Sequence, residues 1–171
     1  MRPIPKTSST SADEIDSRLR AFLDGNDIPT AARMSNLINY FREPALRDIE
    51  AAFGLTRPEV GILLFLNVCE GITAAEFCEF SGQLKAGVSR AVILLEEKGL
   101  IRREMDTSDN RRQRLFMKDA GRKLYKRYIP MLRAREQSML SCLLAVERDQ
   151  LDTLLDKLNR HVASLARQRD L

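Results

Sequence analysis

Three arginines and one aspartate crowd a short polar segment of the chain: Asp109, Arg111, Arg112 and Arg114. Residues 100–105 and 115–117 on either side are strand-like, and residues 106–110 are dense in turn formers, which predicts a hairpin with a basic tip. A guanidinium at a hairpin tip can enter the DNA minor groove, whose potential is most negative where it is narrow. Since Asp109 precedes Arg111 by two residues, we expect its carboxylate to hold the Arg111 guanidinium in a bidentate pair.

A second group of polar side chains belongs to the helix predicted just before this hairpin. Val88, Val92 and Leu95 share one face of that helix, and Gly99 ends it. Its polar side chains include Lys85, Ser89 and Arg90. A recognition helix contacts phosphates and base edges through its first residues and its exposed face, so we expect these three residues to contact DNA.

Two capping boxes start the helices that must position this site. Thr56 with Glu59, and Thr73 with Glu76, have the spacing at which each side chain bonds the other residue's amide. Residues 60–66, which follow the first box, are apolar nearly all round, which predicts a buried central helix.

Longer helical patterns flank this central part. Apolar residues keep a helical step over 31–53, where Pro44 is expected to break or kink the helix, and Gly54 ends it. The pattern is helical again from Gly121 to the end, with a break expected near 145–146. These long apolar stripes need a partner surface, and a second copy of the chain is the most natural source.

Residues 31–165 resemble the MarR family of bacterial transcription regulators. The resemblance rests on the two Thr-x-x-Glu starts, on residues 88–101, on Asp109-x-Arg111, and on Ala120-Gly121. It implies a homodimer whose terminal helices interlock, whose recognition helices enter successive major grooves of double-stranded DNA, and whose wings reach the flanking minor grooves. It also implies a pocket for a small aromatic or phenolic effector, for which the candidate residues are Tyr40, Phe41, Phe65 and Tyr125. Core packing explains these aromatic residues equally well.

One departure from the family pattern concerns the start of the recognition helix. Leu84, Ala86 and Gly87 stand where polar residues are usual, so few donors remain to read bases. We therefore expect the wing arginines to supply more affinity than the helix supplies specificity.

The predicted fold class is mainly α: a winged helix-turn-helix with a two-stranded β-hairpin wing and long N- and C-terminal dimerisation helices. The predicted domains are a flexible tail with a short helix over 13–24 (1–30), an N-terminal dimerisation helix (31–54), a winged helix-turn-helix lobe (55–118) and C-terminal dimerisation helices (119–171).

The charge of the chain is concentrated in the predicted DNA-binding part. The formal net charge is only +4, but residues 83–127 hold 13 Lys and Arg against 6 Asp and Glu. The rest of the chain is slightly acidic, with 15 against 18. This contrast illustrates the hypothesis of a basic surface along recognition helix and wing.

Composition makes several other classes improbable. The longest apolar runs stop well short of the roughly 18 residues of a membrane span, and no signal-peptide pattern opens the chain, which predicts a cytoplasmic protein. The 3 cysteines, Cys69, Cys78 and Cys142, suggest neither disulfides nor a zinc site, and we take them first as small core residues. With His161 as the single histidine, we expect no catalytic residues, metal or cofactor.

The favoured hypothesis is a homodimeric DNA-binding regulator, most naturally a repressor released by a small molecule. Two alternatives stay open. The winged helix could be only a scaffold for protein interaction, which the apolar start of the recognition helix favours, or the cysteines could make the protein a redox-sensing regulator.

Overall fold

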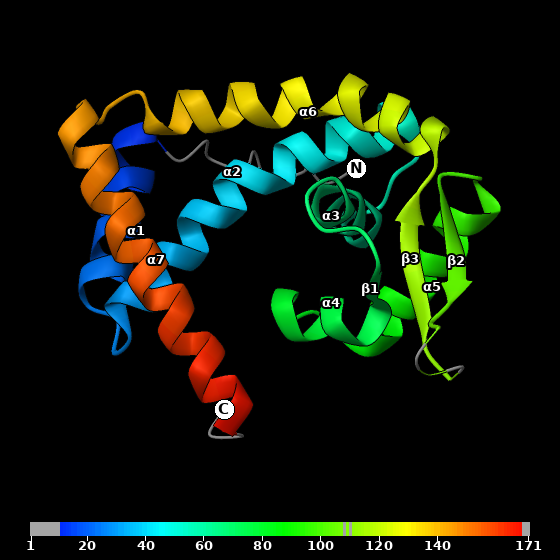
Figure 1. Ribbon diagram of the computed structural model, residues 1–171. Helices are drawn as coiled ribbons and strands as arrows, with labels where there is room; N and C mark the ends of the chain where they lie inside the picture. Colours follow the sequence, from blue (N-terminus) through cyan, green and yellow to red (C-terminus); the bar gives the residue numbers. More distant parts are fainter. Residues whose placement is uncertain (1–10, 108, 110, 169–171) are drawn as a thin grey trace, which may run out of the picture. The chain divides into compact units, whose positions relative to one another are not determined.

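The computed structural model of the chain describes residues 11–107, 109 and 111–168 (Figure 1). Its elements follow the order α1 (Ala12–Asp24), α2 (Pro29–Phe53), α3 (Arg57–Leu66), β1 (Ile72–Thr73), α4 (Ala74–Ser81), α5 (Lys85–Glu97), β2 (Ile101–Met105), β3 (Gln113–Met117), α6 (Asp119–Leu140) and α7 (Ala145–Gln168). The chain divides into two compact units between Arg42 and Glu43, within α2. The mainly helical winged-helix fold predicted from the sequence is confirmed.

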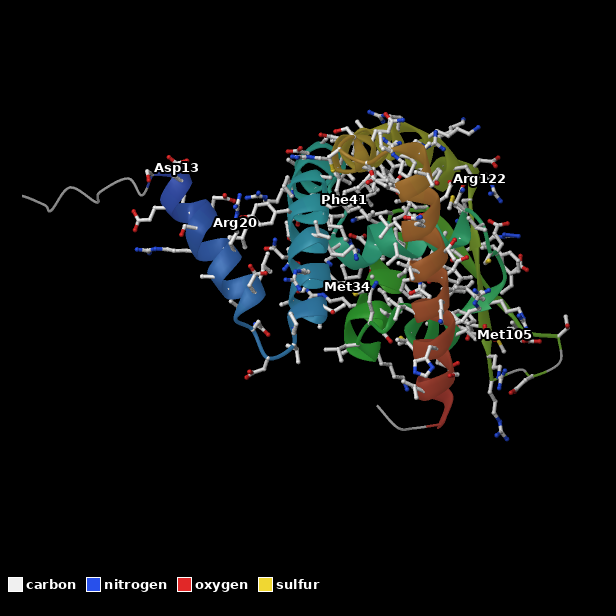
Figure 2. All side chains as sticks on the ribbon, turned by 90° about the vertical axis from the view of Figure 1, so that its left-hand side faces the viewer. Asp13, Arg20, Met34, Phe41, Met105 and Arg122 are labelled. Atoms are coloured by element: carbon white, nitrogen blue, oxygen red, sulfur yellow. The ribbon has the colours of Figure 1, made fainter. Side chains whose placement is uncertain are left out.

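The helix expected over 13–24 is present as α1 in the first unit. The Ser11 side chain accepts a hydrogen bond from the Glu14 amide at 3.3 Å and so caps the helix. Polar side chains project from it: Figure 2 shows Asp13 and Arg20, and Arg20 pairs with Asp16 at 2.8 Å. Exposed ion pairs of this kind add little stability. The helix therefore depends mainly on its caps and on the packing of its apolar side chains.

Pro44 does not break α2, contrary to one of the two outcomes predicted for it. The helix continues through this proline to Phe53, although proline removes one backbone donor. Ala45, Leu46 and Ile49, directly after it, are buried in the core of the second unit. We attribute the continuity of the helix to this packing, which outweighs the lost hydrogen bond. The helix ends at Gly54, which has φ +64°, as predicted.

The first capping box joins three elements of the second unit. The Thr56 amide donates to Glu59 Oε2 at 2.7 Å, and Glu59 is fully buried at the start of α3. The Lys98 ammonium, just after α5, reaches Glu59 Oε1 at 2.5 Å and the Gly54 carbonyl at 2.7 Å. The ends of α2 and α5 are therefore tied to the start of α3, and the buried carboxylate has its cation.

The predicted hairpin is present and carries a third strand that the sequence did not predict. The antiparallel sheet has the order β1-β3-β2, with Ile101 opposite Met117 and Met105 opposite Gln113 in the hairpin. Ile72 of β1 pairs with Leu115. A strand of two residues is too short to show any periodicity, so only pairing in the folded chain reveals it.

A glycine fixes the approach of α6 to the sheet. A Cβ placed on Gly121 would lie 2.3 Å from the Leu100 carbonyl oxygen, so only glycine fits there. The same carbonyl accepts the Lys118 amide at 2.9 Å. Figure 1 shows α6 leading away from the sheet as a long helix. The expected chain reversal falls at 141–144, between α6 and α7.

Candidate nucleic-acid interface

The polar residues predicted on the recognition helix are all exposed. Helix α5 buries Val88, Ala91, Val92 and Leu95 against the core. Lys85, Ser89 and Arg90 are exposed, and within the described part of the chain neither cation has an ion pair. These two charges are therefore available to a partner outside the chain.

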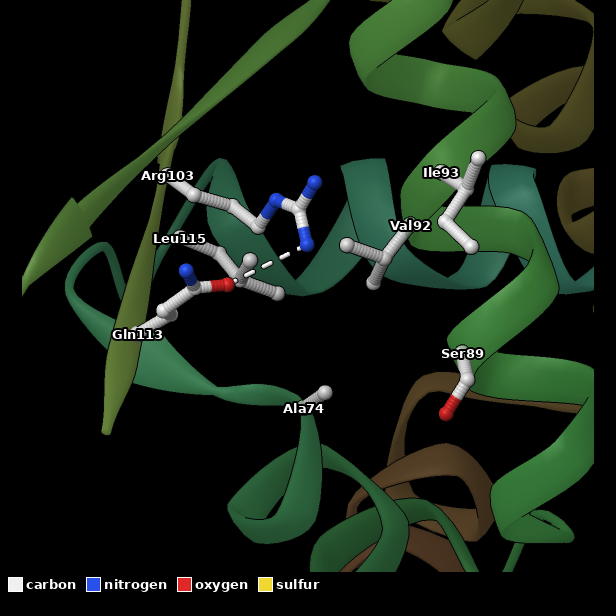
Figure 3. A pocket seen from close by; sticks show the side chains of 7 residues that line it. All are labelled: Ala74, Ser89, Val92, Ile93, Arg103, Gln113 and Leu115. Atoms are coloured by element: carbon white, nitrogen blue, oxygen red, sulfur yellow. Dashed lines mark hydrogen bonds between the residues drawn. The ribbon is translucent and has the colours of Figure 1, made fainter. Parts of the chain in front are cut away.

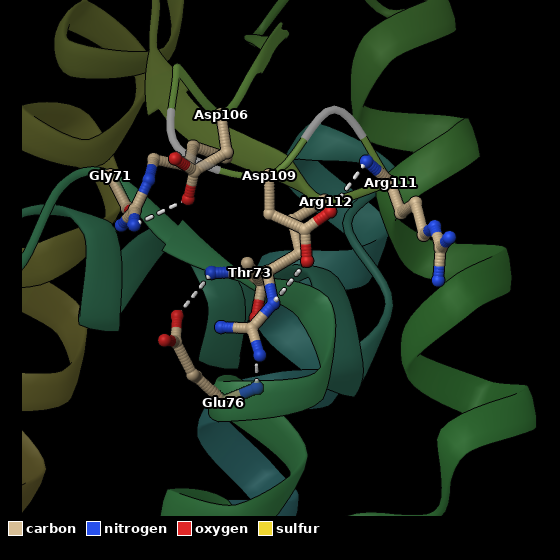
Figure 4. A network of polar contacts seen from close by, with 8 residues as sticks. Gly71, Thr73, Glu76, Asp106, Asp109, Arg111 and Arg112 are labelled. Atoms are coloured by element: carbon tan, nitrogen blue, oxygen red, sulfur yellow. Dashed lines mark hydrogen bonds and ion pairs between the residues drawn. The ribbon is translucent and has the colours of Figure 1, made fainter.

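Backbone hydrogen bonds close the tip of the wing. The Asp106 amide donates to the Arg112 carbonyl at 2.9 Å, and the Arg112 amide donates to the Asp109 carbonyl at 2.9 Å. The Asp109 side chain accepts from the Arg111 amide at 3.0 Å, which is an Asx turn (Figure 4). These bonds position Asp109, Arg111 and Arg112.

Asp109 does not hold the Arg111 guanidinium, so that prediction is wrong. Its carboxylate pairs instead with Arg112, with Nε 3.4 Å from Oδ2. The Asx turn bonds Asp109 to the amide of Arg111, and Figure 4 shows the Arg111 side chain directed away from this carboxylate. The Arg111 guanidinium has no ion pair within the described ranges, and the side chain is exposed. It is the cation that the wing tip leaves available.

Arg114 has two partners inside the fold. Its guanidinium donates to the Gly71 carbonyl at 2.7 Å and pairs with Asp106 Oδ2 at 2.5 Å. Asp106 is only 3% exposed, so Arg114 neutralises a buried carboxylate at the base of the hairpin. Arg114 therefore has a structural role at the base of the wing that the sequence did not indicate. Its contact with DNA stays a prediction.

The second capping box lies beside these arginines. The Thr73 amide donates to Glu76 Oε2 at 2.7 Å, and Thr73 Oγ accepts from the Glu76 amide at 3.1 Å. The Thr73 amide bond, with help from the charges of Arg114 and Arg112, lowers the pKa of Glu76. The carboxylate therefore stays ionised and caps α4 while it faces the wing base.

Arg103 connects the wing to the recognition helix. Its guanidinium bonds Glu96 on α5 and donates to Gln113 on β3 at 3.1 Å. The hydrogen bond from Arg103 lowers the pKa of Glu96, and the same bond raises the pKa of Arg103. Arg102, on the other face of β2, lies 4.9 Å from the centre of the Phe116 ring.

A pocket of about 150 Å³ lies between α5 and the wing (Figure 3). Its lining residues come from α4, α5 and both wing strands: Ala74, Ser89, Val92, Ile93, Arg103, Gln113 and Leu115. None of the four predicted aromatic residues lines it. Tyr40 and Phe41 belong to the first unit, Phe65 packs on Phe77 and Phe80, and Tyr125 packs on Tyr128. The aromatic pocket stays a prediction.

Two of the three cysteines are not the core residues that we expected. Cys69 and Cys142 are exposed, because Cys69 follows the end of α3 and Cys142 follows α6. Cys78 is half-buried and packs against the core. No group of three metal-binding side chains occurs among the described residues. In the same part of the chain, no helix is long and apolar enough to span a membrane.

Fewer cations are available at the surface than the sequence suggests. Of the 13 basic residues of 83–127, six pair with carboxylates of the described residues: Lys98, Arg102, Arg103, Arg112, Arg114 and Arg122. The cations left available on recognition helix and wing tip are therefore Lys85, Arg90 and Arg111.

A helix-turn-helix followed by a β-hairpin, with cations on both, defines a winged-helix protein of the DNA-binding regulator class. Residues 53–112 match the model of the MarR family. The chain is 27% identical over 104 residues to the transcriptional regulator HosA of Escherichia coli, which covers 61% of this chain and 77% of HosA. Through the match over residues 53–112, the chain is similar to the MarR family.

Two further proteins are similar to the chain. A MarR family regulator from Silicibacter pomeroyi has a crystal structure that matches 81% of this chain and 91% of its own, with 27% identity and a TM-score of 0.71. An HTH-type transcriptional repressor of Mycobacterium tuberculosis is 28% identical over 115 residues, 67% of this chain and 83% of that protein. Its structure in complex with p-aminosalicylic acid covers 86% of this chain and 98% of its own, with 22% identity and a TM-score of 0.55.

Proposed function

We propose that this chain is a homodimeric transcriptional regulator, a repressor and not an enzyme, that binds a pseudo-palindromic operator in double-stranded DNA. The main support for this proposal is the exposure of three cations on the recognition helix and wing tip. Lys85, Arg90 and Arg111 have no ion pair within the described chain. Nearby arginines, by contrast, are neutralised by carboxylates. Exposed cations at these positions can bind phosphate oxygens of DNA or enter a narrow minor groove.

The apolar surface of α7 supports the dimer. Every side chain from Asp152 to Ala163 is exposed in the single chain. Four of them form an apolar stripe: Leu154, Leu155, Leu158 and Val162. A stripe of this kind needs a covering surface, and an identical stripe on a second copy is self-complementary. Dimerisation also supplies the two recognition helices that a palindromic operator requires.

We further propose that a small aromatic acid releases the operator, by analogy with the Mycobacterium tuberculosis relative. Two sites can take it: the α5–wing pocket, where a carboxylate would compete with Glu96 for Arg103, and the predicted aromatic pocket. With p-aminosalicylate as the probe, we expect duplex release. Loss of that release in Arg103→Ala, with release kept in Tyr125→Phe, would assign the first site; the reverse would assign the second.

A salt series tests the DNA-binding role. Duplexes enriched by the chain from a random-sequence library are titrated by fluorescence anisotropy between 50 and 200 mM salt. Three cations on each of two protomers predict about six phosphate contacts, and so a loss on the order of a thousandfold in affinity across this range. A flat salt response, or no enriched duplex, would overturn the proposed function.

A further inference from the structure

The start of the recognition helix contains three exposed residues without a polar side chain, Leu84, Ala86 and Gly87. No contact among the described residues explains their presence there. Leu84 is 84% exposed at the N-cap position of α5, and its side chain makes no capping hydrogen bond. Ala86 and Gly87 follow on the helix and are exposed as well. Leucine is a poor N-cap residue, because it offers no acceptor to the free amides.

Gly87 is a second position where the sequence gives up helix stability. Glycine is the least favourable residue in a helix interior after proline. A Cβ placed on Gly87 meets nothing within 4 Å, and Gly87 is not among the glycines with positive φ. Neither backbone conformation nor packing within the chain therefore requires glycine here, in contrast to Gly121. A glycine at this position would still allow another molecule to approach the helix backbone closely.

The charges around this turn indicate what approaches it. Lys85 and Arg90 lie on the same helix, and Arg111 lies at the wing tip, all exposed and without an ion pair within the described residues. This surface suits a polyanion that also presents apolar groups. In the DNA major groove the apolar group is the 5-methyl of thymine, which alanine and other apolar side chains contact.

We propose that Leu84 and Ala86 read thymine methyl groups in the major groove, and that Gly87 lets the helix approach closely enough for them to do so. This inference rests on the proposed DNA-binding function and deepens it. It gives the helix a base-reading role that needs no hydrogen-bond donors. Each half-site is thus expected to contain at least one thymine that the helix reads through its methyl group.

The test removes the methyl group without changing any hydrogen bond. In the enriched duplex, each thymine is replaced in turn by uracil, symmetrically in both half-sites, and affinity is measured by anisotropy. Burial of one methyl is worth about a fourfold change, so two symmetric replacements should weaken wild-type binding about fifteenfold at the thymine that is read. At the thymine that Leu84 reads, Leu84→Ala should bind the thymine duplex more weakly and respond less to the replacement, because the shorter side chain covers less of the methyl, whereas Leu84→Met should remain fully sensitive.

Two further variants separate the space that Gly87 leaves for DNA from its effect on the stability of the protein. Gly87→Ala should raise the melting temperature by about 2–4 °C, because alanine favours the helix, and yet bind the duplex at least tenfold more weakly. Val68→Ala is the matched control, because Val68 is 80% exposed in the turn after α3 and belongs neither to α5 nor to the wing; it should bind like the wild type.

The outcomes distinguish this inference from the function on which it rests. Wild-type binding that is salt-dependent but indifferent to every uracil replacement, or Gly87→Ala with unchanged affinity, would overturn the methyl-reading proposal and leave the DNA-binding role standing. If the chain enriches no duplex and its affinity for a protein partner falls in Leu84→Ala, both proposals fail, and the exposed turn is a protein-binding surface.

Discussion

The wing arginines show how side chains of one type take different roles within a few residues. Arg111 is exposed and has no ion pair in the described chain, whereas Arg114 bonds the Gly71 carbonyl and neutralises the buried Asp106. Removal of Arg111 breaks no ion pair among the described residues, but removal of Arg114 takes a cation away from a buried carboxylate. Their substitution should therefore separate binding from folding.

We expect Arg111→Ala to weaken operator binding about tenfold or more and to leave the free energy of unfolding unchanged within ~0.5 kcal/mol. Arg114→Ala should cost about 3 kcal/mol of folding stability, because it removes the cation that pairs with the buried Asp106 and the donor to the Gly71 carbonyl. Anisotropy and urea denaturation measure the two quantities. Arg18→Ala, whose side chain is exposed on α1, is a control for both. Equal binding by wild type and Arg111→Ala would remove Arg111 from the interface.

Tyr128 on α6 has an unsatisfied buried hydroxyl. The residue is fully buried, and its hydroxyl has no hydrogen-bond partner among the described residues. Burial raises the pKa of Tyr128, because the charged phenolate would lose its hydration. The folded protein therefore holds the neutral phenol, and ionisation above pH 10 favours the unfolded chain.

We expect Tyr128→Phe to increase the free energy of unfolding by about 1 kcal/mol at pH 7, since it removes a buried polar group without a partner. The raised pKa means that this tyrosine's contribution is lost as pH rises above its unfolded value near 10. Urea denaturation at pH 7 and 10.5 should show a smaller alkaline loss in the variant. A destabilised Tyr128→Phe would mean that the hydroxyl has a partner after all.

At the scale of elements, two carboxylates on α4 and α5 stabilise the winged-helix lobe only when ionised. Glu76 caps α4 through the Thr73 amide, and Glu96 on α5 holds Arg103 of the wing. The pKa of each is lowered from the model-compound value of 4.5. Their contribution to stability is therefore complete above about pH 4.5 and is lost as pH falls through the lower folded values.

We expect the free energy of unfolding to fall as pH decreases below about 4.5. In that range the carboxylates of Glu76 and Glu96 bind protons more readily in the unfolded chain than in the folded chain. Glu76→Gln keeps the shape of the cap but cannot ionise, so its pH profile should be flatter. Urea midpoints at pH 5.5, 4.5 and 3.5 would measure this, with Glu79→Gln, exposed on the same helix, as the control. Parallel profiles for Glu76→Gln and the wild type would contradict the assignment.

At the scale of the whole molecule, the apolar stripe on α7 predicts the oligomeric state. We expect the double variant Leu154→Asp, Leu158→Asp to raise the dimer dissociation constant on the order of a thousandfold, because each dimer would place four charges where leucines are buried. Sedimentation velocity would report monomer, and operator affinity should fall with it. Thr153→Asp, on the opposite face of the helix, should stay dimeric. A wild-type chain that is monomeric at all concentrations would refute the dimer.

Local chemistry along the sequence determined where most elements begin and end. The capping boxes at Thr56 and Thr73, the glycine stop at Gly54 and the turn formers of the wing predicted helices and hairpin that the structure contains. These signals depend on residues within a few positions of one another, so they can be read before folding. The basic residues of the interface were visible for the same reason.

Only the tertiary structure decided which of those charges remain available. Arg114 reaches the Gly71 carbonyl across 43 residues, and Lys98 reaches Glu59 across 39. Asp109 sits beside Arg111 in sequence, yet the turn aims its carboxylate at Arg112. A charge pair forms where folding brings its members together and lowers the cost of burying them, which no spacing in the sequence specifies. The sequence determined the positions of the cations, and packing determined that Lys85, Arg90 and Arg111 are exposed without an ion pair to any residue that the structure describes.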